Sequence, residues 1–288
     1  MFDIIVPTYN RYDILPEFFA NLEAIDKTLY TLWLIDDCSP KKDASIVPAW
    51  DNIRYIQLPE NIGQAGARNY AIKNGNAPYV ISLDDDAWFV AGSQDLKVIA
   101  EAFSTYPDAG CLMFNIATPK TDYIGDVDGL LLPLHVTCGC AYRRNALEQI
   151  GGFNSKIHSG AEETDISLKL YRANWDIRSL YSVHVYHKFD PGERSVDWYL
   201  DVRYKTTRNS LIIAYLYYPA LSLIWVLPGR ALSHIVFAIK TGVARGKTIS
   251  ITINAIFAFI GRIPSLRKDR MPLSQQQFKK WTALFKTP

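Results

Sequence analysis

Short apolar runs alternate with segments of helical spacing over the first 190 residues of the chain. Apolar positions recur at every third or fourth residue over 12–25, which predicts a helix, and a second helix is expected over 65–74 after a glycine-containing turn. Strands that alternate with helices of this length are typical of a mostly parallel sheet with helices on both faces. The predicted strands cover residues 2–7, 32–35, 53–58 and 79–83.

Polar and acidic residues directly follow three of the predicted strands. They occupy positions 8–11, 36–37 and 84–86. In open α/β sheets, ligands bind beyond the carboxyl ends of the strands. We therefore expect the binding site at this edge of the sheet.

The adjacent acids Asp84, Asp85 and Asp86 predict a cation or a set of donors beside them, because neighbouring carboxylates repel one another. Carboxylates suit Mg²⁺ or Mn²⁺ bound alongside substrate phosphates. A solvated acidic turn is the alternative, which the position directly after an apolar strand disfavours. Further along, His184 and His187 lie in a strand-like alternation, where an imidazole is either structural or a ligand to a cation held by Asp86.

Two further segments fit contacts to a nucleotide. Asp36 and Asp37 either accept hydrogen bonds from a base or a ribose, or cap the next helix. Small residues over 61–67 begin a helix whose first N–H groups favour an anion. Arg68, one turn into this helix, either reaches a phosphate, pairs with a nearby aspartate or is an ordinary surface arginine.

Glu162, Glu163 and Asp165 open another predicted helix. Acids in a first helical turn are favoured by the helix dipole alone. Two adjacent glutamates beside an aspartate exceed what capping needs. One of them is therefore a candidate general base, with its pKa raised by the charge of its neighbour.

Composition and charge divide the chain in two. Its 288 residues are 49% apolar and 21% charged, which is globular and excludes disordered, collagen-like and disulfide-scaffold proteins. The net charge of +2 hides an uneven distribution. Residues 1–202 carry 17 basic and 28 acidic side chains, a net −11, whereas residues 203–288 carry 14 basic side chains and one acid, a net +13. We expect a catalytic domain over 1–202 and a basic, apolar, helical region over 203–288.

Three interpretations of the basic region stay open. Residues 209–229 are uncharged and long enough to span a membrane, although Pro219 weakens this. Amphipathic helices on an anionic membrane surface fit better, because basic residues interrupt the apolar stretches. The third interpretation is a soluble helical subdomain, which either completes the acceptor site of the catalytic domain or forms a homo-oligomer interface. Residues 1–3 run into the first strand without a secretory signal, so we expect a cytoplasmic protein at the inner face of the cell membrane.

Six segments, in their order and spacing, resemble family 2 glycosyltransferases of the GT-A fold. They are residues 4–11, 35–39, 61–63 with 67–69, 83–86, 151–153 and 162–165. The resemblance covers about residues 1–210 and implies a Rossmann-like, mostly parallel sheet. It also implies an inverting transfer of a sugar from a nucleotide diphosphate to an acceptor hydroxyl, with Mn²⁺ or Mg²⁺.

The resemblance implies roles for individual residues. Asp86 and His187 correspond to the metal site. Glu162 and Glu163 correspond to the catalytic pair, and Glu163 is favoured as the base, although the family more often has aspartate there. The nucleotide-binding residues that it implies are Pro7, Thr8, Tyr9, Arg11, Asp36, Asp37, Arg68, Asp84 and Asp85.

Many similar bacterial enzymes build surface polysaccharides, so the resemblance implies a UDP- or dTDP-sugar donor and a lipid-linked saccharide acceptor. A nucleotidyltransferase is the alternative enzyme, but residues 7–11 are not the glycine-rich basic loop that a triphosphate needs. A nucleic-acid-binding protein would use the basic region. Its long apolar stretches and the −11 charge of residues 1–202 disfavour that interpretation, so we expect no nucleic-acid partner.

Overall fold

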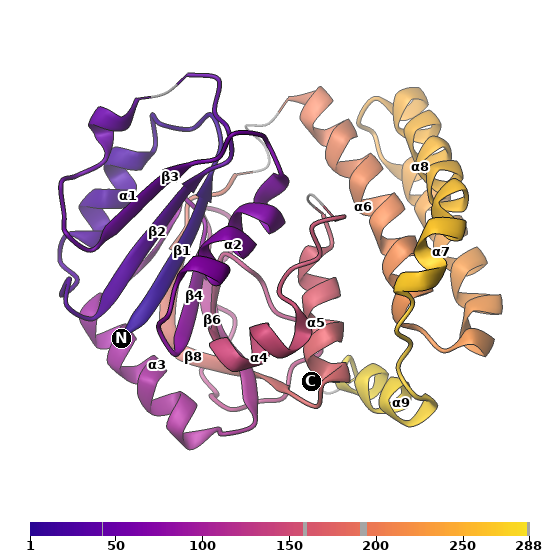
Figure 1. Cartoon of the computed structure of the whole chain (residues 1–288). Coiled ribbons are helices and arrows are strands. Elements are labelled where there is room, and N and C mark those ends of the chain that lie inside the picture. Colours follow the sequence, from indigo (N-terminus) through magenta and orange to yellow (C-terminus); the bar gives the residue numbers. More distant parts are fainter. Residues whose placement is uncertain (42, 158–159, 191–194, 287–288) are drawn as a thin grey trace.

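An eight-stranded sheet forms the centre of the first two thirds of the chain, in the order β3-β2-β1-β4-β7-β6-β8-β5. The computed structural model describes residues 1–41, 43–157, 160–190 and 195–286 (Figure 1). The strands are β1 (Phe2–Thr8), β2 (Tyr30–Asp36), β3 (Ile53–Gln57), β4 (Tyr79–Leu83), β5 (Ala87–Phe89), β6 (Ala109–Ala117), β7 (Gly139–Arg143) and β8 (Asp176–His187).

The mostly parallel sheet predicted from the sequence is confirmed. Strand β1 pairs in parallel with β2 and β4, and β2 with β3, so the carboxyl ends of these four strands meet at one edge. Strand β7 enters antiparallel between β4 and β6, while β8 returns parallel to β6 and pairs antiparallel with β5. The continuous apolar run of β1 fits a strand that is covered on both faces.

Helices cover both faces of the sheet (Figure 1). Helices α1 and α3 pack on one face and α2, α4 and α5 on the other, each with its own apolar core. The first helix is shorter than predicted, because residues 12–14 form a turn and Pro16 occupies the first helical turn, where its missing N–H costs nothing. The helices are α1 (Leu15–Leu22), α2 (Gly63–Asn74), α3 (Ser93–Thr105), α4 (Arg144–Ile150) and α5 (Glu162–Arg172), with a 3₁₀ turn at Ala44–Ile46.

Four more helices form the C-terminal part: α6 (Val196–Tyr217), α7 (Ala220–Lys240), α8 (Arg245–Leu266) and α9 (Gln275–Leu284), with a 3₁₀ turn at Arg267–Asp269. The single span suggested over 209–229 is wrong. The chain becomes extended at Tyr218, because Pro219 disfavours a helical conformation in the residue before it, and α6 ends there. By length and composition, α7 and residues 245–269 are the described helices that could cross a membrane.

Helix α6 packs against the catalytic part of the chain, which is the sheet-containing region over residues 1–190 within the catalytic domain expected from the sequence. Its apolar face forms a third core with α8, α9 and two residues of the preceding part, Ile157 and Leu168. On α9, the indole N–H of Trp281 donates a hydrogen bond to the carbonyl of Pro133. The predicted boundary at 202/203 lies within α6, so the division into two domains stays a prediction.

Helix α7 leaves most of its apolar residues uncovered. Trp225 is 79% exposed and Leu221 72%. On α8, Phe257 is 66% exposed. These two helices fit a membrane-associating region.

Candidate active site

A cleft of about 930 Å³ lies beyond the carboxyl ends of β1, β2 and β4. Helix α6 forms another wall of this cleft, so residues from both parts of the chain face one space. A smaller cavity of about 180 Å³ adjoins the cleft, and five residues line both spaces. The cleft is lined by Tyr9, Arg11, Asp37, Asn61, Gly63, Gln64, Asp84, Asp86, Gly160, Glu163, His187, Phe189, Trp198, Val202, Lys205 and Arg208.

The smaller cavity brings together most of the nucleotide-binding residues implied by the resemblance. Pro7, Thr8 and Tyr9 form one side, and Tyr9 is 48% exposed. Asp37 faces them, and its Oδ1 accepts a hydrogen bond from the backbone N–H of Ile62. Arg11, Gln64, Asp84 and Asp85 complete the lining.

Arginines and neutral donors keep the three acids apart. Asp84 pairs with Arg68 at 2.5 Å, and Arg11 bridges Asp85 and Asp86 through its two terminal nitrogens, each at 2.6 Å. Asp85 also accepts a hydrogen bond from the hydroxyl of Thr8 at 2.8 Å. Burial raises the pKa of Asp85 to about 7 despite Arg11 and Thr8. Each acid therefore has a positively charged partner, which offsets their mutual repulsion.

Asp86 and His187 form a site that fits a divalent cation. Oδ1 of Asp86 is buried and accepts no hydrogen bond, and Nε2 of His187 lies 3.1 Å from it. The same nitrogen is 3.9 Å from Oδ2 of Asp84. Burial would raise the pKa of Asp86, but His187 and Arg11 lower it to about 2, so the carboxylate is charged at neutral pH. Carboxylate oxygens with one imidazole suit Mn²⁺.

Cys138 is a contact of the candidate cation site that the sequence did not indicate. Its buried Sγ lies 3.4 Å from Nδ1 of His187, and potential ligand atoms of Cys138, His187 and Asp84 lie within 4.8 Å of one another. A partner on one ring nitrogen fixes the direction of the other. Cys138 precedes β7 at a position where only the folded sheet brings it near β8, so no local pattern could have identified it.

Arg68 lies beneath the site and does not line either cavity. Its side chain is fully buried, with Nε donating to the hydroxyl of Ser82 at 3.0 Å and a terminal nitrogen paired with Asp84. Of the alternatives open for Arg68, the structure therefore shows the pairing with a nearby aspartate, and Arg68 supports the site from beneath. Its charge also lowers the pKa values of Glu162 and Glu163, although burial raises them more.

Asp36 is likewise placed in the protein interior. Its Oδ1 accepts hydrogen bonds from the N–H and hydroxyl of Ser39, and its Oδ2 from Tyr12 and Gln57. These donors occupy both oxygens, so Asp36 holds the loop after β2, whereas Asp37 lines the cavity.

The two glutamates at the start of α5 differ in position. Glu163 lines the cleft with Asp84, Asp86 and His187, and its Oε1 lies 3.4 Å from the hydroxyl of Thr137. Glu162 is buried and accepts a hydrogen bond from Gln64. Two residues with positive φ, Gly160 (79°) and Ala161 (73°), turn the chain directly before the helix and direct its first turn toward the cleft.

Helix α6 supplies residues that the sequence analysis did not assign to the site. Trp198, Val202, Lys205 and Arg208 line the cleft. The one available signal was that the family resemblance extends to about residue 210, within α6.

Comparisons with known proteins agree with this geometry. Residues 3–124 match the sequence profile described as Glycosyl transferase family 2. The chain is 25% identical over 172 residues to the uncharacterized glycosyltransferase YwdF of Bacillus subtilis, covering 54% of this chain and 63% of that protein. It is 34% identical over 91 residues to the poly(ribitol-phosphate) beta-N-acetylglucosaminyltransferase TarS of Staphylococcus aureus, covering 30% of this chain and 16% of TarS. The chain thus spans less than two thirds of the length of these relatives.

Solved structures share the fold over most of the chain. The crystal structure of S. aureus TarS 1–349 in complex with UDP-GlcNAc superposes with a TM-score of 0.62 at 20% identity, over 91% of this chain and 81% of that one. The mannosyltransferase PcManGT from Pyrobaculum calidifontis, in complex with GDP-Man and Mn²⁺, superposes with a TM-score of 0.58 at 16% identity, over 98% of this chain and 83% of that one. At these identities the likeness establishes the GT-A fold. Residues 3–124 thus match the sequence profile of family 2 glycosyltransferases, and the chain has the GT-A fold.

Proposed function

We propose that the protein transfers a sugar from a nucleotide-diphosphate donor to an acceptor hydroxyl, with inversion at the anomeric carbon. The observation that carries this proposal is one cleft that holds a carboxylate, Glu163, together with the charged acids and the imidazole of a cation site. The nucleotide complexes of TarS and PcManGT support a nucleotide-sugar donor.

The donor nucleotide occupies the smaller cavity in this proposal. Pro7, Thr8 and Tyr9 line the space for the base, with the carboxylate of Asp37 to accept from a base N–H. Asp84 faces both cavities and is placed for the ribose. The Mn²⁺ in the PcManGT complex supports a divalent cation in this site.

Asp86 and His187 hold the divalent cation in this proposal. When bound, the cation neutralises charge that develops on the departing diphosphate. Arg11 adds a second positive charge at the same acids.

Glu163 is the proposed general base. An acceptor hydroxyl loses its proton as it attacks the anomeric carbon, so a carboxylate must lie on the face away from the leaving group. Burial raises the pKa of Glu163, which makes it a stronger base than an exposed glutamate. One direct displacement then inverts the configuration.

Glu162 has a positioning role in this proposal. Burial and the neighbouring Glu163 raise the pKa of Glu162 to about 8, so it is largely protonated at neutral pH. A neutral Glu162 leaves the negative charge of the pair on Glu163, the residue that faces the cleft.

The acceptor is proposed to be a lipid-linked saccharide at the inner face of the cell membrane. The uncovered apolar residues of α7 and α8 support attachment to a lipid surface. The charge of +13 over 203–288 adds attraction to anionic lipids, worth about 1 kcal/mol per basic group near the surface.

Glu163→Gln should lower sugar transfer at least about 100-fold, because the amide cannot accept the proton of the acceptor hydroxyl. A thermal-shift screen of UDP- and dTDP-sugars with Mn²⁺ identifies the donor first, since a bound donor stabilises the fold. Donor binding by the variant should equal that of the wild type. The exposed Glu148→Gln serves as the control, and full transfer activity in Glu163→Gln would assign the base elsewhere.

Asp86→Ala should weaken UDP binding in the presence of Mn²⁺ by at least about tenfold, because the cation loses a charged ligand. Calorimetry with and without Mn²⁺ measures this, and the exposed Asp122→Ala is the control. The same gain in UDP affinity on adding Mn²⁺ in wild type and in Asp86→Ala would contradict the metal assignment.

Glu162→Gln should make the metal-free protein more stable at pH 9 by several kcal/mol, because a pKa raised from 4.5 to about 8, at about 1.4 kcal/mol per pKa unit, corresponds to about 5 kcal/mol. The pKa of Glu162 is about 8 in the folded protein against an ordinary value of 4.5. The folded state therefore binds more protons between these values, and its stability falls as the pH rises through this window. Urea unfolding in EDTA should show the two proteins alike at pH 4.5, and a wild type as stable as the variant at pH 9 would refute the shift.

The full-length protein should float with phosphatidylglycerol vesicles, and less with phosphatidylcholine vesicles, because both apolar contact and charge contribute. Trp225→Ser on α7 should reduce flotation, whereas Ile124→Ser, at an exposed apolar residue of the catalytic part, should not. Recovery of the wild type only in the vesicle-free fraction would overturn the membrane assignment.

A further inference from the structure

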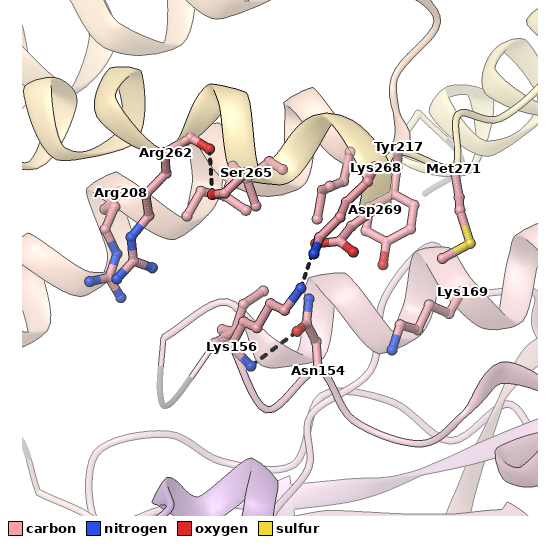
Figure 2. Close-up of a pocket in the computed structure, with 14 residues that line it drawn as sticks. Asn154, Lys156, Lys169, Arg208, Tyr217, Arg262, Ser265, Lys268, Asp269 and Met271 are labelled. Atoms are coloured by element: carbon pink, nitrogen blue, oxygen red, sulfur yellow. Dashed lines mark hydrogen bonds and ion pairs between the residues drawn. The ribbon is translucent and has the colours of Figure 1, made fainter.

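A separate cavity of about 530 Å³, distinct from the cleft and the smaller cavity of the candidate active site, lies between the catalytic part and the C-terminal helices. The loop over 154–157 and helix α5 form one wall, and α6 and α8 form the other (Figure 2). Its volume is in the range of small-molecule sites. The cavity is lined by five basic side chains and one acid, which are Lys156, Lys169, Arg208, Arg262, Lys268 and Asp269.

Only two of these cations have carboxylate partners among the described residues. Lys156 pairs with Asp269 at 2.5 Å, and Lys169 lies 3.6 Å from Asp165. Over the ranges that the structure describes, no ion pair joins Arg208, Arg262 or Lys268 to an acid. The cavity therefore concentrates positive charge, with five basic side chains against one acid, Asp269, whose pKa is lowered by Lys156 and Lys268.

Arg208 and Arg262 bring their guanidinium groups to the same end of the cavity (Figure 2). Burial and the charge of Arg262 lower the pKa of Arg208, while Tyr204 and Asp201 raise it in part, and the two like charges repel each other. An anion between them would remove this repulsion. Guanidinium groups bind phosphate oxygens through paired N–H donors, which suits a diphosphate or a phosphodiester.

Arg208 also connects this cavity with the catalytic cleft. It lines both spaces, whereas the acids of the donor site line only the cleft and the smaller cavity. A molecule that enters the cleft beside α6 can therefore place a hydroxyl near Glu163 and an attached anion at Arg208. The remaining lining is largely apolar, with Ile212, Leu216 and Leu266 from α6 and α8.

We propose that this basic cavity binds a phosphate or diphosphate group of the acceptor, adjacent to the saccharide that occupies the catalytic cleft. This assignment rests on the proposed transferase function and adds that the acceptor is anionic. A phospholipid headgroup carries the same chemistry, so the test separates the two sources.

The test compares Arg262→Ser/Lys268→Ser with the wild type in binding inorganic pyrophosphate, measured by calorimetry in EDTA. Both side chains are exposed, so the variant should fold. Its affinity should fall at least about tenfold, since two charged hydrogen bonds are lost. Lys279→Ser/Lys286→Ser removes two exposed charges from the same region outside the cavity and should bind like the wild type. Equal affinity in all three proteins would overturn the proposal.

Two further measurements separate the explanations. UDP binding with Mn²⁺ should be the same in all three proteins. If the wild type fails to bind UDP while the pyrophosphate difference stands, the transferase function fails and the anion site remains. If instead the cavity variant loses binding to phosphatidylglycerol vesicles but keeps its affinity for pyrophosphate, the cations serve a lipid headgroup and the acceptor assignment is wrong.

Discussion

The pairing of three adjacent acids with two arginines is the interaction on which the site depends. Asp84, Asp85 and Asp86 could not remain together at the end of β4 without nearby positive charge. Arg68 holds the first from below, and Arg11 bridges the other two from the loop after β1. Removing one partner of such a buried pair leaves an uncompensated charge. These ion pairs join α2, β4 and the β1–α1 loop, and they leave one oxygen of Asp86 free to face His187.

The C-terminal helices complete the catalytic part of the protein. Helix α6 lines the cleft and buries its other face against α8 and α9. The uneven charge of the sequence thus becomes an arrangement in space. The acids gather at the carboxyl ends of the strands and the start of α5. Lys205 and Arg208 of α6 line the same cleft, and Arg262 of α8 lines the neighbouring cavity that Arg208 also reaches.

Sequence patterns predicted those elements whose formation depends on residues close to them along the chain. The first four strands, helix α2 and the acidic start of α5 follow from periodicity and turn residues. Sequence patterns did not predict that Asp36 is buried in hydrogen bonds while Asp37 faces the cavity. That difference depends on Gln57, a donor that the parallel pairing of β2 and β3 brings close to Asp36. Cys138 was missed for the same reason, since only the sheet places it beside His187.

The positions of charge along α8 explain how one helix can serve both a lipid surface and an anionic acceptor. Ile253, Phe257 and Ile260 are exposed apolar residues in its middle, whereas Arg262 lies near its C-terminal end and Lys268 in the 3₁₀ turn that follows. A lipid-linked acceptor carries its phosphate at the boundary between apolar chain and water. The helix has the same order of apolar and cationic groups. An anion held at that boundary is kept from the carboxylates of the donor site, which would otherwise repel it, while the attached saccharide can still reach Glu163.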